Sequence, residues 1–504
     1  MIPTIPRWAW QRCRPALLIL FATAPAFAQS QSTPEPPKPT VILIRPAAAA
    51  QPALGTPLLP TRREQHPGNA ATYYHRAIEQ VLQSRSSWNQ SNHPGPGKPL
   101  PESPEVKTAR WSAAPPAEIP VEEARKVLQG FTAPLRECEF GAFCDTCDWG
   151  LDQRFESYDL LLPEIQDVRI LSRLVILRAR LAVLDGKRDE ATHWIKVGLA
   201  MARQVGDGPT LIQALVGIAM TGGTLSAYED LIQAPGTPSL YWSLTNTPRP
   251  FISMERSLDT ERTLLERMLP RLDTLGTETW TRELAQQTVN DLMRRIELFT
   301  LDYREKTARL DLKQTTQRLA LATLVAKVYP QARRALIASG RTAAEVDAMP
   351  ALQVSLLHTY RVYANQRDDM YKWTSLPYYE GYRQLGAFTK ASPADNPMLA
   401  MLQLLMPAIN SAKQAEVRLD RRLAALRAIE AIRMHAAAGD GQLPASLGDV
   451  AVAPIPLDPA TGKPFEYERA ADGKSAQLKA PVIPGGPNHP SFALHYNLRL
   501  APSR

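Results

Sequence analysis

The sequence predicts a mainly α-helical protein: an irregular antiparallel helical array, followed by a small C-terminal α+β hairpin module. Apolar residues recur at steps of three and four over residues 163–185, and the pattern restarts at once over 187–206. This is the periodicity of two amphipathic helices joined by a very short turn. Near the C-terminus the period changes, because residues 465–469 alternate like a half-buried strand before an Asp-Gly turn at 472–473.

Residues 1–28 have the parts of a secretory signal peptide. A basic stretch with Arg7, Arg12 and Arg14 precedes the apolar run 16–24, and Ala26-Phe27-Ala28 is a small-x-small cleavage pattern. We therefore expect a Sec-type signal peptide and an exported protein, periplasmic or extracellular. The alternative, a retained membrane anchor, matches less well because the apolar run is short for a span.

The rest of the chain divides by composition into three parts. Residues 29–67 are rich in proline and alanine and are predicted to be a linker. Residues 68–395 are expected to form the helical array, and 396–504 a long helix with the β-hairpin module and a tail. No apolar stretch after the signal is long enough for a membrane helix, so we expect no transmembrane span in the mature chain.

Helices are predicted from apolar spacing, caps and breakers. An asparagine cap at Asn69 starts the first one, and Gly439 ends the last. The predicted ranges are 69–87, 121–130, 131–139, 163–185, 187–206, 210–233, 254–272, 281–328, 329–339, 343–371, 398–409 and 410–438.

Composition and motifs exclude several classes of protein. The net charge of +8 over 504 residues is too mild to indicate a nucleic-acid partner. The sequence has no glycine-rich phosphate loop, dinucleotide fingerprint, serine elbow or His-Glu-x-x-His pair. We therefore predict no cofactor, no metal ion and no catalytic residue, although carboxylates that folding brings together would leave no linear motif.

Three cysteines remain after the signal peptide, Cys138, Cys144 and Cys147, all within ten residues. An odd number leaves at least one unpaired within the chain. In an oxidising compartment the first alternative is one local disulfide, followed by reduced structural thiols. A metal site is the third alternative, because its fourth ligand would have to come from elsewhere in the chain.

Two groups of aromatic and cationic residues are candidates for ligand binding. Amphipathic rings beside cations suit a polar partner such as a glycan or peptide. Packing between helices explains the same residues equally well. The candidate binding residues are Trp149, Tyr241, Trp242, Arg249, Tyr371 and Trp373.

Two local patterns resemble known families. The hairpin 163–206 resembles a tetratricopeptide unit, with small residues at Ala179, Gly186 and Ala191, although no repeat of that length recurs. The C-terminal passage resembles the helix-to-sheet region of type II secretion pseudopilins. That resemblance rests on the helical run Ala428 to Arg433, on Leu443-Pro444, Asp458-Pro459 and Gly462 to Phe465, and on Tyr467. It implies a local fold but no polymerising function, since the N-terminal apolar helix and glutamate of a pilin are missing.

A wider resemblance covers much of the mature chain. The blocks Cys147 to Leu151, Thr210 to Gly217 and Leu240 to Leu244 are similar to a group of uncharacterised exported helical proteins of bacteria. This resemblance implies no activity. We expect a non-catalytic binding or scaffold protein that presents a helical surface to a cell-envelope protein, peptide or glycan. The alternatives are a hydrolase of envelope polymers and an accessory of a secretion system.

Overall fold

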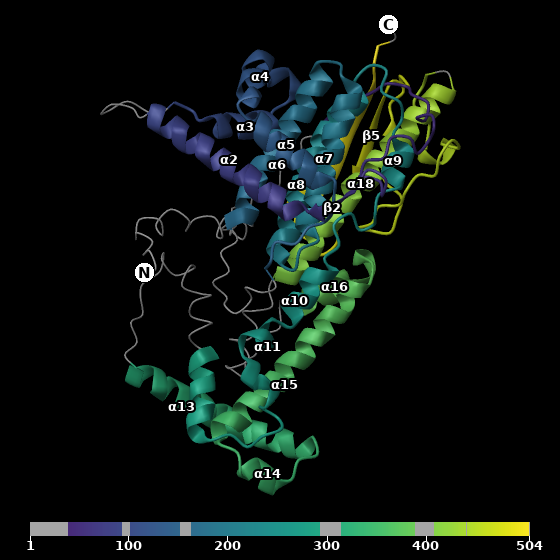
Figure 1. The fold of residues 1–504 in the computed structure, drawn as a ribbon. Helices are drawn as coiled ribbons and strands as arrows, with labels where there is room; N and C mark the ends of the chain where they lie inside the picture. The colour runs from purple at the N-terminus through teal and green to yellow at the C-terminus, as the bar shows by residue number, and fades with distance from the viewer. Residues whose placement is uncertain are drawn as a thin grey trace. The chain divides into compact units, whose positions relative to one another are not determined.

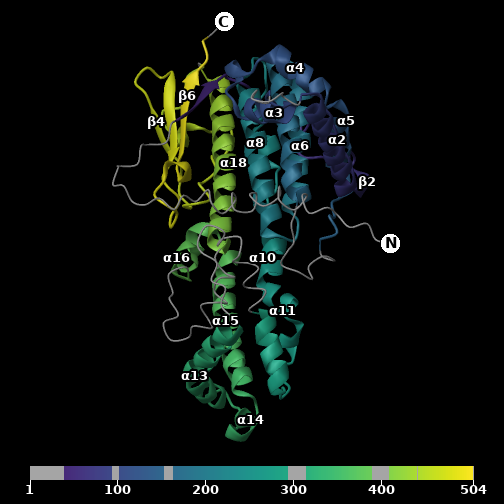
Figure 2. The same ribbon diagram turned by 90° about the vertical axis from the view of Figure 1, so that its left-hand side faces the viewer.

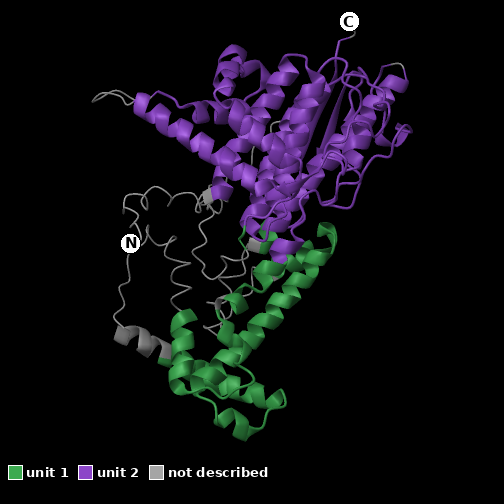
Figure 3. Cartoon of the chain, viewed as in Figure 1, with its two compact units in different colours: residues 1–32, 150–161, 259–411 green, residues 33–149, 162–258, 412–504 purple. Residues whose placement is uncertain are grey.

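The computed structural model describes residues 39–92, 101–151, 163–292, 314–388, 408–439 and 441–502. In these ranges the protein is mainly helical with a small C-terminal sheet, as the sequence predicts (Figure 1). Figure 3 shows the two compact units into which the chain divides. The large unit holds Thr33–Trp149, Leu162–Leu258 and Ala412–Arg504, and the small unit holds Met1–Ser32, Gly150–Leu161 and Asp259–Ser411.

This division differs from the predicted domains, because the C-terminal module belongs to the same unit as the first helices of the array. Most of the small unit comes from the middle of the chain. The large unit contains, before its last helix, α2 (Ala70–Ser91), α3 (Pro104–Ala113), η2 (Pro116–Glu118), α4 (Val121–Gln129), α5 (Thr132–Ala142), α6 (Pro163–Leu184), α7 (Arg188–Gly206), α8 (Leu211–Gln233), α9 (Tyr241–Thr245) and the short strands β2 (His66–Asn69) and β3 (Cys144–Thr146).

Helices α6, α7 and α8 form the centre of the large unit and pack on one another. The turn between α6 and α7 needs Gly186, whose φ of +72° lies in the left-handed region. Between α7 and α8 the backbones touch: a Cβ added to Gly217 would lie 2.6 Å from the Cα of Gly206. The predicted helical hairpin is therefore present, while its kinship with tetratricopeptide repeats stays a prediction.

Helix α8 is rich in apolar residues. Among the described residues it is the one helix that passes a test for a membrane span by length and composition. A buried core helix passes the same test, and 61% of its most apolar window lies inside the protein.

The C-terminal sheet has four strands in the order β1-β6-β5-β4. Strand β6 (Leu494–Leu500) pairs antiparallel with β5 (Ser475–Ala480), which pairs antiparallel with β4 (Glu466–Arg469). The predicted hairpin thus corresponds to β4 and β5. Short 3₁₀ turns, η6 (Leu447–Asp449) and η7 (Pro490–Phe492), lie in the connections.

Strand β1 (Thr40–Ile44) corrects the prediction that residues 29–67 are only a linker. It joins the edge of the sheet parallel to β6. Its sequence Thr-Val-Ile-Leu-Ile alternates between the two faces, with Ile42 and Ile44 buried and Val41 and Leu43 exposed. The proline-rich surroundings hid a strand that is too short to change the average composition.

Helix α18 (Ala408–Ala438) runs beside the sheet (Figure 2). Its predicted stripe of Leu419, Leu423, Leu426 and Ile429 is buried, and it ends before Gly439 as expected. The predicted helix at 398–409 lies almost entirely outside the described residues.

The small unit has a separate apolar core, which includes Leu275, Trp280 and Val354. The single helices predicted at 254–272 and 343–371 are each broken into shorter elements, the second because Pro350 starts a new helix. The predicted break at Tyr329 is absent, and Pro330 lies inside a continuous helix. The elements are α10 (Glu255–Arg262), which crosses the unit boundary, α11 (Leu264–Met268), η4 (Pro270–Asp273), α13 (Gln314–Ala338), α14 (Ala343–Asp347), α15 (Ala351–Tyr371), η5 (Lys372–Ser375) and α16 (Tyr378–Phe388).

Candidate functional site

Tyr371 and Trp373, two of the predicted binding residues, lie where α15 ends and η5 begins. Both are half-buried. The turn that follows and the start of α16 add more exposed apolar surface, with Leu376 39% and Tyr379 40% exposed. We call Trp373, Leu376, Tyr379 and Tyr382 the aromatic surface of the small unit.

Packing and cations fix the rings of this surface. Tyr382 stacks on the buried Tyr378 at a centroid distance of 6.0 Å. Arg383 donates a hydrogen bond from Nε to the Tyr382 hydroxyl at 3.1 Å, and Lys372 Nζ lies 5.8 Å from the Trp373 ring centroid. The rings are therefore held in place before any partner arrives, which lowers the entropy cost of binding.

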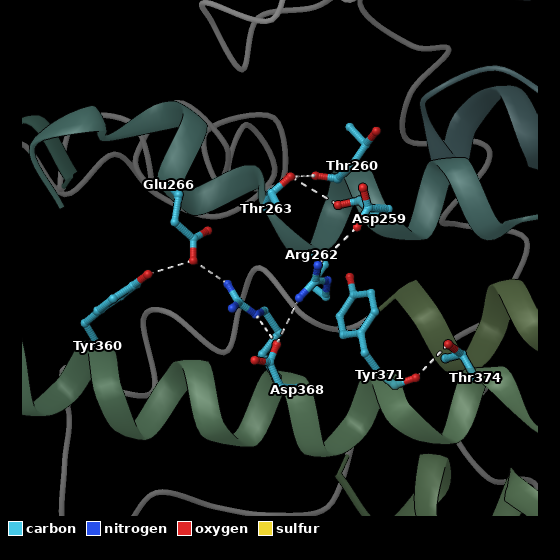
Figure 4. A network of polar contacts seen from close by, with 10 residues as sticks. Asp259, Thr260, Arg262, Thr263, Glu266, Tyr360, Asp368, Tyr371 and Thr374 are labelled. Atoms are coloured by element: carbon cyan, nitrogen blue, oxygen red, sulfur yellow. Dashed lines mark hydrogen bonds and ion pairs between the residues drawn. The ribbon is translucent and has the colours of Figure 1, made fainter. Parts of the chain in front are cut away.

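A polar network holds the end of α15 against α10 and α11 (Figure 4). The buried Arg367 guanidinium donates to Glu266 Oε1 at 2.6 Å and to Asp368 Oδ1 at 3.1 Å. Tyr360 donates its hydroxyl to the same Glu266 oxygen at 2.7 Å. The Arg367 cation is thus paired within the unit.

The tyrosines around this network stay protonated, and Tyr360 donates its hydroxyl to Glu266. Burial raises the pKa of Tyr363 to about 12, and burial followed by the bond to Glu266 raises the pKa of Tyr360 further. Burial and the nearby Glu261 likewise raise the pKa of Tyr371. A phenol that stays protonated is a poor general base, so the geometry suits binding better than proton transfer.

In the large unit, the structure corrects the expectation that Trp149 and Tyr241 face a ligand. Both rings are buried. Trp149 stacks on Tyr74 at 6.1 Å, and Tyr241 donates its hydroxyl to the carbonyl of Pro454 at 2.6 Å. Trp149 and Tyr241 therefore pack within the large unit. This is the alternative to ligand binding that the sequence analysis gave for both aromatic groups.

Trp242 and Arg249 remain at the surface of the large unit. Trp242 is half-buried and meets the Tyr241 ring edge-on at 5.0 Å. Arg249 is exposed and donates to the carbonyl of Thr245 at 2.7 Å, which stiffens the loop that follows α9. These two residues belong to the large unit, whereas Tyr371 and Trp373 belong to the small one.

Cys138, Cys144 and Cys147 are free thiols in the structure, in place of the local disulfide that stood first among the alternatives. Burial raises the pKa of Cys147 to about 12 and also raises the pKa values of the other two. Thiols held in this form react slowly. Within the described residues no group of three or more His, Cys, Asp or Glu side chains is placed to hold a metal ion.

Helix α18 carries buried ion pairs that the sequence analysis missed. Arg421 forms two hydrogen bonds to Asp458, at 2.9 and 2.8 Å, and both side chains are almost fully buried. Arg433 pairs with Glu430 at 2.7 Å, again with both side chains inaccessible. Asp458 lies 37 residues after Arg421, so the sequence could not reveal that pair. The spacing of Glu430 and Arg433 is local but does not show that the pair is buried.

Within the described residues, the side chains of these pairs also form hydrogen bonds with other groups. Glu430 also accepts the hydroxyl of Tyr228 at 2.7 Å, and Arg433 donates to the carbonyl of Thr237 at 2.7 Å. Arg422 similarly binds Glu229, which accepts the Tyr496 hydroxyl. Buried charges with complete hydrogen bonding fix the packing of the helix on the sheet and leave nothing free for chemistry.

Asp420 is another partly buried charged residue of α18. Burial raises its pKa to about 7, while the backbone N–H of Phe251, which it accepts at 3.0 Å, lowers the pKa. Glu416, one helical turn earlier, raises the pKa of Asp420 further by its charge, while Lys413 and Arg249 oppose that effect. A carboxyl that titrates near neutrality is a feature of many catalytic acids, and also of carboxyls that are merely buried.

Comparison of the chain with models of protein families, with characterised proteins and with solved structures found no match. The resemblances drawn from short sequence patterns therefore stay predictions.

Proposed function

We propose that the protein is an exported, non-catalytic binding protein, and that the aromatic surface of its small unit binds a glycan of the cell envelope. The observation that carries this proposal is the set of aromatic rings at η5 and α16: Tyr379 is exposed, and the half-buried Trp373 and Tyr382 are held by cations and stacking. Export follows from the predicted signal peptide and belongs to the proposal.

A glycan fits this surface for two physical reasons. Sugar rings have an apolar face that packs on Trp and Tyr, and hydroxyls that bond to phenols and amines at the ring edges. Trp373 and Tyr379 supply such faces, and the Tyr382 hydroxyl and Lys372 lie beside them. A protein or peptide partner would rely more on apolar contact with Leu376. The dependence of binding on Leu376 therefore distinguishes a glycan from a protein or peptide experimentally.

The test is the retention of purified envelope polysaccharide by immobilised protein, residues 29–504. The double variant Trp373→Ala/Tyr379→Ala should lose most of the binding, because each buried aromatic contact contributes about 1 kcal/mol or more. A matched control, Trp88→Ala/Phe140→Ala, also removes one indole and one six-membered ring, but from the large unit. The control should bind like the unaltered protein, and equal binding by the first variant would refute the proposal.

A hydrolase of envelope polymers is the second candidate, and Asp420 with Glu416 is the observation that favours it. In that function Asp420 would act as the protonated acid and Glu416 as the second carboxylate. Incubation of the protein with the same polysaccharide would then release reducing ends, and Asp420→Asn would abolish the release. Failure of the unaltered protein to release any would remove this candidate.

A further inference from the structure

The C-terminal sheet of the large unit has a face that points away from α18. The pairing register decides which side chains lie on it: Gln477 is opposite Asn497 and Glu468, and Ser475 is opposite Arg499. The alternate residues Ala476, Leu478 and Leu498 are buried on the other side. On the edge strand β1, Val41 pairs with Asn497 and Leu43 with Arg499. We call this set of outward residues the outer sheet face.

The outer sheet face is hollowed. A depression of about 610 Å³ is lined by Glu468, Lys474, Ser475, Gln477, Asn497 and Arg499, among others. Its walls are mostly polar, in contrast to the apolar packing beneath the sheet. A hollow of this size accommodates several side chains of a partner.

Two cations in the hollow are available to a ligand. Lys474 and Arg499 are exposed, and among the described residues neither head group has a hydrogen bond or an ion pair, although the charge of Lys474 acts on Asp472. The nearest acids are occupied: Glu468 pairs with Lys479 at 3.2 Å, and Asp472 accepts the backbone N–H groups of Lys474 and Ser475. The arginines of α18 at positions 421, 422 and 433, by contrast, are all in ion pairs.

The remaining groups on the outer sheet face match a peptide better than a simple anion. The side-chain amides of Gln477 and Asn497 each offer both a donor and an acceptor, which is the pattern of a peptide backbone. Val41 and Leu43 are 45% and 37% exposed beside them, so the same face offers aliphatic contact. A phosphate or sulfate polymer would use only the donors and would gain nothing from the aliphatic side chains.

We propose that the outer sheet face binds an extended acidic peptide segment of a partner protein. Carboxylates of the peptide pair with Lys474 and Arg499, its backbone bonds to Gln477 and Asn497, and its apolar side chains rest on Val41 and Leu43. This site lies in the large unit, and the inference does not depend on glycan binding by the small unit.

The experiment measures binding of a fluorescent synthetic peptide of about eight residues, alternating Glu and Leu, a length that spans the sheet. The full mature chain should bind it, whereas a Gln-Leu peptide of the same length should bind far more weakly. The variant Lys474→Gln/Arg499→Gln should weaken binding by about tenfold or more, because it removes both cations that pair with the carboxylates of the peptide.

The matched control is Arg63→Gln/Lys463→Gln, which removes two exposed cations from the same unit but outside the hollow. It should leave the affinity nearly unchanged, and an equal loss in both variants would show bulk attraction and overturn the site. A third variant, Val41→Ser/Leu43→Ser, should weaken the acidic peptide but not polyphosphate. The assignment of a peptide would be overturned by two results together. Polyphosphate would displace the peptide, and the Val41→Ser/Leu43→Ser variant would bind both ligands as tightly as the unaltered protein does.

Discussion

At the scale of single residues, the large unit depends on buried charges that are paired completely. Glu430 and Arg433 lie one helical turn apart on α18 with no exposed surface. Tyr228 and the Thr237 carbonyl take up their remaining hydrogen-bonding capacity. Each member is therefore costly to remove alone, because its partner would be left charged and unpaired in the interior.

Replacing Arg433 with Met should lower the free energy of unfolding by about 3–5 kcal/mol, the usual cost of breaking a buried pair. The double variant Glu430→Gln/Arg433→Met should recover a large part of that loss, because no uncompensated charge remains. Urea unfolding of both variants measures the effect. An Arg433→Met protein as stable as the original would mean that water reaches this pair.

Asp420 should make the stability depend on pH. Its pKa is raised in the folded protein to about 7 from a usual value of 3.8, so the unfolded chain loses the proton first as the pH rises. The contribution of Asp420 to stability is therefore full below about pH 4 and declines up to about pH 7, by on the order of 4 kcal/mol. Asp420→Asn should remove this decline.

The measurement is the difference in unfolding free energy between the original protein and Asp420→Asn at a series of pH values from 4 to 8. The charges of Glu416, Lys413 and Arg249 also act on the pKa of Asp420, Glu416 raising it and the two cations lowering it. A difference that does not vary with pH would contradict the raised pKa.

At the scale of elements, strand β1 makes the N-terminal segment part of the C-terminal sheet. Ile44→Ala should lower the free energy of unfolding by about 2–5 kcal/mol, because the side chain is fully buried. Val41→Ala, on the opposite face of the same strand, should cost well under about 1 kcal/mol. Thermal unfolding of the two variants checks this contrast, and equal effects would mean that β1 is not docked.

Elements with a strong local signal were predictable, and those defined by distant partners were not. The cap at Asn69 and the end of α18 at Gly439 follow from local chemistry, and both are confirmed. Strand β1 has a clear alternation of apolar residues between its two faces but is only five residues long. Its place in the sheet depends on pairing with β6, more than 400 residues away. The break at Pro350 has a local cause, because the proline starts a new helix there. Helix α13, by contrast, accommodates Pro330 without ending.

The candidate sites divide in the same way. Aromatic density singled out Tyr371 and Trp373, which are half-buried, but density alone could not separate them from Trp149 and Tyr241, which are buried. The outer sheet face left no signal, because Lys474 and Arg499 line the same hollow only through the pairing of β5 with β6, in which Ser475 is opposite Arg499.

At the scale of the whole molecule, the chain builds two units, each with its own core. The proposed glycan site lies in the small unit and the proposed peptide site in the large unit. A binding protein with two independent sites can join two components of the envelope, since attachment of one then raises the local concentration of the other.

The central claim, that the aromatic surface binds a glycan, is tested most directly by hydrogen–deuterium exchange of the native chain with and without purified envelope polysaccharide. Bound glycan should slow exchange in η5 and α16, and Trp373→Ala/Tyr379→Ala should abolish that protection while leaving the exchange of the large unit unchanged. Saturating polysaccharide that leaves η5 and α16 unprotected, or that protects only other segments, would contradict the claim.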